Sequence, residues 1–398
     1  MKIAILTSGI LPIPAVQGGA VENLIDFYLA YNNQHKLHDI TVYSVAHQKT
    51  QNHPALCSHV NHYHYIDTSS ILAKIRRTFY KILHKNEYYN YFIEYYFEQA
   101  YKDIKKQLYD YIILENRPGY AYKLSQRTTS KLILHLHNDL LNQETIFHHD
   151  ILNSLYKILT VSDYIKTRVY SIESTDKVCT IHNGIDIERF SHKAQCAIKK
   201  ENFRLSQNDF VIIFCGRINK EKGIAELIDS ILMLKSKIKL KLLVLGSSFF
   251  GNTNNDDSFI TSLKNRAKQI EDNIIFTGFI PYNNVPDYLA MADIAVIPSI
   301  WNDPFPTTVL EAQAMGLPII TTRRGGIPEE VTDKNAILLK TDEHFVENLA
   351  TAILDLYNNP EKRKQMAAVS LERSKLFDKE TYAKNFFAAL DSIDSTDR

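Results

Sequence analysis

The feature that most constrains the fold is an alternation of short, almost wholly apolar runs with longer amphipathic ones, which occurs twice along the chain. Such alternation is typical of parallel sheets whose strands, buried on both faces, are connected by helices. The first half contains six candidate strands, at 2–7, 40–44, 109–115, 131–137, 157–162 and 177–182. The second half contains six more, at 210–215, 239–245, 273–277, 293–298, 318–322 and 336–339. The sequence therefore predicts two α/β domains.

The length of 398 residues also favours two domains, because one hydrophobic core rarely serves a chain of this size. We expect an N-terminal Rossmann-like domain over 1–190 and a polar linker over 191–205. A second Rossmann-like domain is expected over 206–377. The last segment, 378–398, is expected to form a helix that packs back on the N-terminal domain.

Composition excludes several classes of protein. The 46 basic and 45 acidic residues leave almost no net charge, which argues against a nucleic-acid-binding protein. Four scattered cysteines do not make a disulfide framework and are expected to be buried thiols in a reducing cytosol. The N-terminus is expected to enter a first strand directly, and no uncharged apolar run approaches the ~18 residues that would span a bilayer. We therefore expect a cytoplasmic protein, with any membrane contact peripheral and on the inner face.

The segment from Leu72 to Leu108 mixes basic and aromatic residues, which suits an anionic membrane interface. The alternative is a helix pair whose aromatic side chains pack on the domain core. The basic residues are Lys74, Arg76, Arg77, Lys81 and Lys85, and the aromatic ones are Phe79, Tyr80, Tyr88, Tyr89, Tyr91, Phe92, Tyr95, Tyr96 and Phe97.

Two glycines, Gly18 and Gly19, follow the first strand and open an amphipathic helix. Backbone amides at such a junction, together with the helix N-terminus, can bind a phosphate, although the glycines can equally serve a tight turn. Neither first strand is followed by the G-x-G-x-x-G pattern, which argues against a nicotinamide or flavin dinucleotide site.

Arg217 and Lys222 lie in the loop after the first strand of the second domain. Open α/β sheets bind ligands at the carboxyl ends of their strands, and two cations there suit a diphosphate. The alternative is that both side chains are simply solvated.

Two carboxylates, Asp303 and Glu311, bracket a Pro-Phe-Pro turn and the start of a helix for which Thr307 is a suitable N-cap. The turn amides and the hydroxyls of Thr307 and Thr308 can bind phosphate or sugar. Glu311 can accept hydrogen bonds from ribose hydroxyls.

His137 ends a strand and faces the expected ligand edge, whereas His135 on the same face lies deeper. Arg117 follows another strand and is a candidate for contact with a negatively charged acceptor. No Asp-x-Asp or helical His pair has the spacing of a metal site, so no metal is expected.

Taken in order and spacing, these motifs resemble retaining glycosyltransferases of family 4, of the bacterial surface-glycan type. The resemblance rests on the glycine loop, the stretch 183–186 with Phe190, the Arg217 and Lys222 pair, Gly278, and the carboxylate motif that ends in Glu311. It implies the GT-B fold, in which two Rossmann-like domains face each other across a cleft where donor and acceptor meet.

By this resemblance, Arg217 and Lys222 bind the donor diphosphate and Glu311 binds the ribose. Asp303 contacts the donor sugar, although the family normally has glutamate there, and His137 lies beside that sugar. The donor sugar and phosphates lie along the backbone of Phe305, Pro306 and Thr307. The nucleobase lies beside the backbone of Phe279 and Ile280.

The activity that the resemblance implies is metal-independent, retaining transfer of a hexose, with a nucleotide-sugar as substrate and no cofactor. UDP is the favoured nucleotide because it is frequent in the family, and the expected acceptor is a glycan or lipid-linked molecule. Alternatives are a soluble small-molecule acceptor, a catalytically silent homologue that stabilises a partner glycosyltransferase, and a sugar-nucleotide epimerase.

Overall fold

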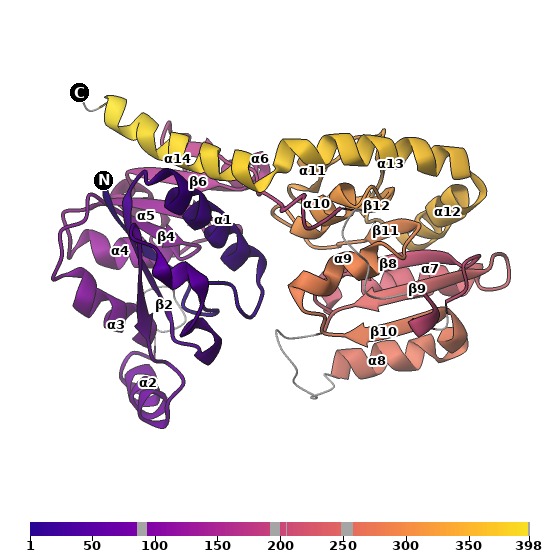
Figure 1. Ribbon diagram of the computed structural model, residues 1–398, viewed down its shortest axis with the longest axis horizontal. Helices are drawn as coiled ribbons and strands as arrows, with labels where there is room; N and C mark the ends of the chain where they lie inside the picture. Colours follow the sequence, from indigo (N-terminus) through magenta and orange to yellow (C-terminus); the bar gives the residue numbers. More distant parts are fainter. Residues whose placement is uncertain (86–93, 192–199, 204, 248–257, 397–398) are drawn as a thin grey trace. The chain divides into compact units, whose positions relative to one another are not determined.

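A computed structural model describes residues 1–85, 94–191, 200–203, 205–247 and 258–396 (Figure 1). The chain forms two compact units. Unit 1 comprises Met1–Asn183 and Glu380–Arg398, and unit 2 comprises Gly184–Lys379. The boundary thus lies at Asn183 and not at residue 190, because Ile185 already pairs with Asp378 inside unit 2. Within the expected linker 191–205, residues 192–199 and 204 lie outside the described part.

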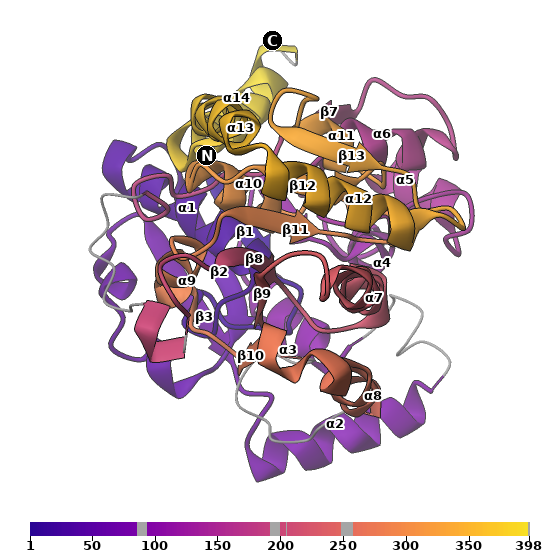
Figure 2. The ribbon, with the colours of Figure 1, turned by 90° about the vertical axis from the view of Figure 1, so that its right-hand side faces the viewer.

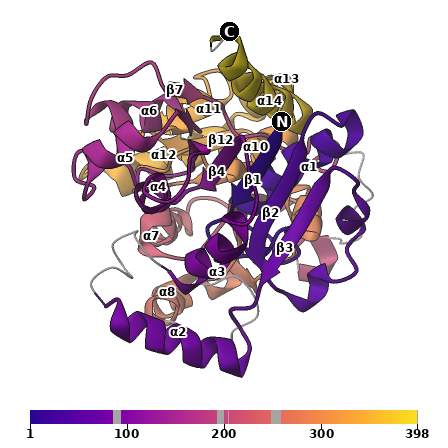
Figure 3. The same ribbon diagram turned by 90° about the vertical axis from the view of Figure 1, so that its left-hand side faces the viewer.

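Unit 1 is built on a parallel seven-stranded sheet with the order β3-β2-β1-β4-β5-β6-β7. Its strands are β1 (Lys2–Leu6), β2 (Asp39–Val45), β3 (Asn61–Ile66), β4 (Tyr111–Glu115), β5 (Lys131–Leu136), β6 (Lys157–Thr160) and β7 (Val178–Thr180). Its helices are α1 (Ala20–His35), α2 (Ile71–Leu83), α3 (Tyr95–Ile104), α4 (Pro118–Ser125), α5 (His148–Ser154) and α6 (Asp163–Tyr170). The sequence analysis missed β3, because Asn61, His62 and His64 interrupt any apolar run there. These polar side chains are tolerated because β3 is an edge strand of the sheet, which is less completely covered than the central strands (Figure 3).

Unit 2 contains a parallel six-stranded sheet with the order β10-β9-β8-β11-β12-β13 (Figure 2). Its strands are β8 (Phe210–Cys215), β9 (Leu240–Leu245), β10 (Ile274–Gly278), β11 (Ile294–Ile297), β12 (Ile319–Thr322) and β13 (Ala336–Leu339), so all six predicted strands are present. Its helices are α7 (Ile224–Leu234), α8 (Ser258–Ala267), α9 (Val285–Leu289), α10 (Thr307–Ala314), α11 (Ile327–Glu330), α12 (Phe345–Asn358) and α13 (Pro360–Ser374). The apolar faces of α7 and α12 pack on this sheet in one core.

The last helix, α14 (Lys379–Thr396), belongs to the core of unit 1. Its apolar side chains, among them Phe386 and Phe387, pack with those of α1 and of the central strands. The rings of Tyr28 and Phe386 stack with centroids 4.1 Å apart. Unit 1 is therefore assembled from the two ends of the chain.

The basic and aromatic segment from 72 to 108 divides into two parts with different environments. In α3, Tyr95, Tyr96 and Phe97 are buried, as the core-packing alternative requires. In α2 the large aliphatic side chains and Phe79 are exposed instead, and Ala73 is buried. Tyr88, Tyr89, Tyr91 and Phe92 lie outside the described residues. None of the described helices is both long and apolar enough to cross a membrane.

The cysteines differ from expectation. Cys57 is exposed, and Cys179 and Cys215 are half-buried as whole residues. Cys196 lies outside the described residues.

Candidate functional site

In unit 2, the loops that leave the carboxyl ends of the strands are held to one another by backbone hydrogen bonds. The Gly216 amide donates to the Leu245 carbonyl over 3.0 Å, and the Gly246 amide donates to the Gly278 carbonyl over 3.0 Å. The loops after β8, β9 and β10 therefore form one continuous rim at the edge where open α/β sheets bind ligands.

Two glycines allow these loops to approach closely. Gly246 has φ 137°, and a Cβ there would lie 1.9 Å from the Gly216 carbonyl oxygen. Gly223 has φ 68°, and a Cβ there would lie 1.9 Å from the Pro298 carbonyl oxygen. Only glycine fits these positions, and Gly223 brings the neighbouring Lys222 against the end of β11.

Lys222 and Asp303, 81 residues apart, form an ion pair at this rim. Their loops are fixed by the backbone, since the amides of Ile300 and Trp301 donate to the Glu221 carbonyl over 3.0 and 3.2 Å. The Asp303 carbonyl in turn accepts from the Gly326 amide over 2.8 Å, and the Asp303 side chain is only 9% exposed. The structure therefore brings together two of the predicted site residues.

Arg217 lies five residues before Lys222 on the same loop, and its side chain is exposed. Within the described part of the chain it makes no ion pair. This guanidinium is therefore available to an anionic ligand at the same rim.

Glu311 lies in the second turn of α10 and is only 4% exposed. Burial raises the pKa of its carboxyl to about 7, although a hydrogen bond from the Thr307 side chain opposes this shift. Burial is the main cause of the raised pKa values of Cys215, at the end of β8, and of Tyr282. The charge of Glu311 raises both of these pKa values further. Glu311 thus lies beside the strand that leads into the Arg217 loop.

The prediction that Thr307 caps α10 is wrong. The helix begins at Thr307 itself, and Pro306, which precedes it, makes no side-chain cap. The Thr307 hydroxyl is one helical turn from Glu311 and bonds with that carboxyl instead.

The remaining predicted donor-binding residues follow β10 and β11. Phe279 and Ile280 come directly after β10 and are half-buried. The ring of Phe305 is buried against Phe377, with centroids 5.7 Å apart, so only the Phe305 backbone can face a ligand. Pro306 is buried and Thr308 half-buried at the start of α10. Their roles stay predictions.

Sequence analysis missed Glu330, which ends α11 and is fully buried. Burial raises the pKa of this carboxyl well above its usual range, with further contributions from the nearby Asp303 and Glu329. Neither carboxyl oxygen has a hydrogen-bond partner among the described residues. The sequence gives no sign that this acid is buried, because a helix of about one turn is too short to show a hydrophobic periodicity.

In unit 1, the glycine loop after β1 has a carboxyl beside it. Gly18 and Gly19 have φ 77° and 107°, and a Cβ on Gly19 would lie 2.1 Å from Oε2 of Glu22. Burial raises the pKa of Glu22 to about 7, assisted by Glu115 and Asp26. The N-terminus of α1 is thus next to an acid of its own, and phosphate binding by this loop stays a prediction.

Arg117 is not a free cation. Its Nη1 lies 3.4 Å from Oε1 of Glu94, and its Nε donates to the Ser8 carbonyl over 3.3 Å. An acceptor that used Arg117 would have to compete with Glu94.

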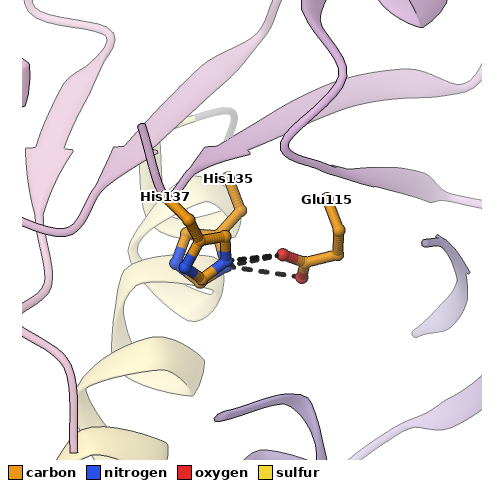
Figure 4. A group of neighbouring side chains, drawn as sticks. All are labelled: Glu115, His135 and His137. Carbon is orange, nitrogen blue, oxygen red and sulfur yellow. Dashed lines mark hydrogen bonds and ion pairs between the residues drawn. The ribbon is translucent and has the colours of Figure 1, made fainter. Parts of the chain in front are cut away.

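The strand ends of unit 1 also contain a buried cluster of Glu115, His135 and His137 (Figure 4). Oε2 of Glu115 lies 2.9 Å from Nε2 of His137 and 3.2 Å from Nδ1 of His135, while Oε1 accepts the Tyr28 hydroxyl over 2.9 Å. Glu115 was not predicted, although its register opposite His135 on β5 is what brings the pair together. A charged group at the end of a wholly buried strand needs such partners.

The protonation of this cluster follows from its burial. Burial raises the pKa of Glu115, but His135 and His137 together lower it to below its usual range. Burial and the charge of His135 lower the pKa of His137 to about 4. At neutral pH an ionised Glu115 therefore accepts from Nε2–H of a neutral His137, which leaves Nδ1 unprotonated.

The same three residues are of types that can bind a metal ion, with one ligand atom from each lying within 4.8 Å of the others. Hydrogen bonds already account for these short distances. The prediction that no metal takes part stays a prediction.

A separate hollow of about 850 Å³ lies in unit 1, lined by residues such as Met1, Tyr109 and Lys131. These residues are at the amino ends of β1, β4 and β5. The hollow is at the opposite edge of the sheet from the cluster and takes no part in the candidate site.

Comparison with known proteins agrees with this arrangement. Residues 197–372 match the family model of "Glycosyl transferases group 1". Unit 2 carries a group 1 glycosyltransferase domain. The putative glycosyltransferase YtcC of Bacillus subtilis is 27% identical, over 90% of this chain and 81% of its own. The lipopolysaccharide 1,2-N-acetylglucosaminetransferase of Salmonella typhimurium is 23% identical, over 56% of this chain and 57% of its own.

The glycosyltransferase domain occurs here within a GT-B fold. The crystal structure of Anabaena Alr3699/HepE in complex with UDP-glucose is similar, with a TM-score of 0.74. The similarity covers 98% of this chain and 100% of that one, at 20% identity. The prediction of two Rossmann-like domains of GT-B type is confirmed.

Proposed function

We propose that this glycosyltransferase is metal-independent and moves a hexose from a nucleotide-sugar, with UDP the favoured nucleotide, to a glycan or lipid-linked acceptor of bacterial surface polysaccharide. The observation that carries the proposal is the arrangement at one rim of unit 2. There Lys222 pairs with Asp303, Glu311 is buried beside the end of β8, and Arg217 is exposed on the same loop.

The two cations suit the part of the donor that gains negative charge. When a sugar leaves a nucleoside diphosphate, charge develops on the diphosphate, and cations placed there stabilise the transition state more than the ground state. Lys222 can turn from Asp303 toward a phosphate. Asp303 is then able to accept hydrogen bonds from hydroxyls of the donor sugar.

Glu311 suits the ribose. Its buried carboxyl has one bond, from Thr307, so it retains capacity for two donors from a ribose diol. Hydrogen bonds to the ionised form offset the cost of burial. Donor binding would therefore supply hydrogen bonds to the Glu311 carboxyl, which has few of them in the free protein.

The reaction breaks the bond between the anomeric carbon and the diphosphate oxygen and forms one to the acceptor oxygen on the same face. The proton of the acceptor hydroxyl passes to the departing phosphate, which serves as base. His137, neutral and held by Glu115, is proposed as a residue that transfer requires. The cations of the protein replace the metal ion that other glycosyltransferases use.

Two comparisons support the choice of donor and acceptor. The structurally similar HepE was crystallised with UDP-glucose. The Salmonella relative builds lipopolysaccharide, as its name states. A soluble acceptor remains the alternative.

Thermal shift with a panel of UDP-, GDP- and dTDP-sugars tests the donor. A donor at 100 times its dissociation constant stabilises by roughly 2.7 kcal/mol, so binding is readily seen. Lys222→Ala should abolish the shift, and Lys220→Ala, an exposed cation on the same turn, should leave it unchanged. Equal shifts for both variants, or none with any donor, would contradict the proposal.

A further inference from the structure

The helix α2 presents an unusually apolar surface to solvent. Six of its thirteen residues are large apolar side chains that are between 48% and 78% exposed: Ile71, Leu72, Ile75, Phe79, Ile82 and Leu83. No other described helix or strand has more than one such side chain. We call these six residues the α2 face.

The α2 face lies on one side of the helix. At 100° per residue the six side chains occupy an arc of roughly 120°. On the other side, Ala73 is buried and the Tyr80 ring lies edge-on to Tyr95 of α3, with centroids 6.4 Å apart. The helix therefore contacts the rest of unit 1 through Ala73 and Tyr80, and its apolar side is exposed.

The conformation of α2 is fixed locally. Ser70 caps the helix by accepting from the Ala73 amide over 3.1 Å. Asp67 accepts from the Ser69 and Ser70 amides over 3.0 and 2.9 Å. The exposed face thus belongs to a well-formed helix with a defined start.

The charge of α2 identifies the kind of partner. The helix has four cations, Lys74, Arg76, Arg77 and Lys81, and no acidic residue. On the helical wheel, Arg76 lies next to one edge of the α2 face, while Lys74 and Lys81 lie beyond the other. Long basic side chains that flank an apolar stripe can reach headgroup phosphates while the stripe enters the acyl boundary.

We propose that the α2 face docks on an anionic lipid bilayer, with the helix lying in the plane of the interface. This proposal extends the proposed function, because docking would bring the enzyme to a lipid-linked acceptor. The docking itself does not rest on the identity of donor or acceptor.

Co-sedimentation of the full chain with phosphatidylcholine vesicles, with and without phosphatidylglycerol, tests the proposal. We expect binding only to the anionic vesicles, weakened by salt. The double variant Lys74→Gln/Arg76→Gln should weaken binding roughly 30-fold, since each cation near the surface contributes about 1 kcal/mol. Ile75→Ser/Phe79→Ser should weaken it by at least about tenfold at any salt concentration.

Matched controls come from exposed residues of unit 2. Met233→Ser removes a 42% exposed apolar side chain from α7, and Lys235→Gln/Lys237→Gln removes two exposed cations. Both should bind vesicles like the wild type. Circular dichroism checks that the α2 variants keep their helix content.

Failure to bind anionic vesicles, or equal losses in the controls, would overturn the proposal. A change in oligomeric state in Ile75→Ser/Phe79→Ser, without vesicle binding by the wild type, would assign the face to a second copy instead. The donor thermal shift of the α2 variants should equal that of the wild type. Loss of that shift in the wild type would sink the proposed function and leave vesicle docking standing.

Discussion

Replacing Glu311 by glutamine should stabilise the free protein and at the same time weaken donor binding. Burial raises the pKa of Glu311 from its ordinary value of 4.5 to about 7. The folded protein then binds more protons than the unfolded chain, so stability falls as pH rises from about 4.5 to about 7 and is level above that. Glutamine keeps the shape and has no charge to bury.

The size of the effect follows from the shift. A change of 2.5 in pKa corresponds to about 3 kcal/mol once both states are titrated. The stability advantage of Glu311→Gln over the wild type should therefore grow by about 2 kcal/mol between pH 5 and pH 8. Because ribose hydroxyls donate more strongly to a carboxylate than to an amide, the affinity for the nucleotide should fall about tenfold or more.

Urea denaturation at the two pH values measures the first effect, and calorimetric titration with UDP measures the second. Glu347→Gln, an exposed glutamate on α12, is the matched control and should change neither. If Glu311→Gln is less stable than the wild type at pH 8, the carboxylate is a satisfied structural group and the reasoning fails. If stability rises but UDP binding is unchanged, Glu311 does not contact the ribose.

Three further predictions address other parts of the structure. Glu115→Gln should lower turnover at least about tenfold while the donor thermal shift stays as in the wild type, because the amide no longer fixes His137 in one tautomer; a parallel loss of donor binding would contradict this. Chelation by EDTA should leave turnover unchanged, whereas loss with recovery on adding zinc would make the Glu115, His135 and His137 cluster a metal site. Gly246→Ala should lower the free energy of unfolding by more than about 2 kcal/mol, since its Cβ would meet the Gly216 carbonyl at 1.9 Å; urea denaturation that shows no loss would mean that the loops after β8 and β9 can separate.

The strands of unit 2 were predictable because each is largely apolar, as a doubly covered parallel sheet requires. The edge strand β3 was not, since His62 and His64 alternate with tyrosines and need no burial. The boundary at Asn183 was missed because the polar stretch after it marks the loop of unit 2 and not the passage between units.

The positions of the candidate site residues relative to the strand ends were predictable one by one, but their pairings were not. Position after a strand identifies Lys222 and Asp303 as neighbours of the ligand edge, yet their ion pair depends on the close approach at Gly223. Glu115 and Glu330 were missed because a lone acid beside apolar residues has no period or spacing that indicates what surrounds it. Only the register with β5 reveals the partners of Glu115.

The return of α14 to unit 1 has a consequence for biosynthesis. The apolar surface around Tyr28 is completed by Tyr382, Phe386 and Phe387, which leave the ribosome after the whole of unit 2. During translation, unit 1 cannot complete its core until α14 has been synthesised, so this apolar surface stays uncovered. Unit 2 is a continuous stretch of chain and can fold as soon as it has been made. A chain interrupted before residue 380 would therefore yield a folded second unit joined to an aggregation-prone first one.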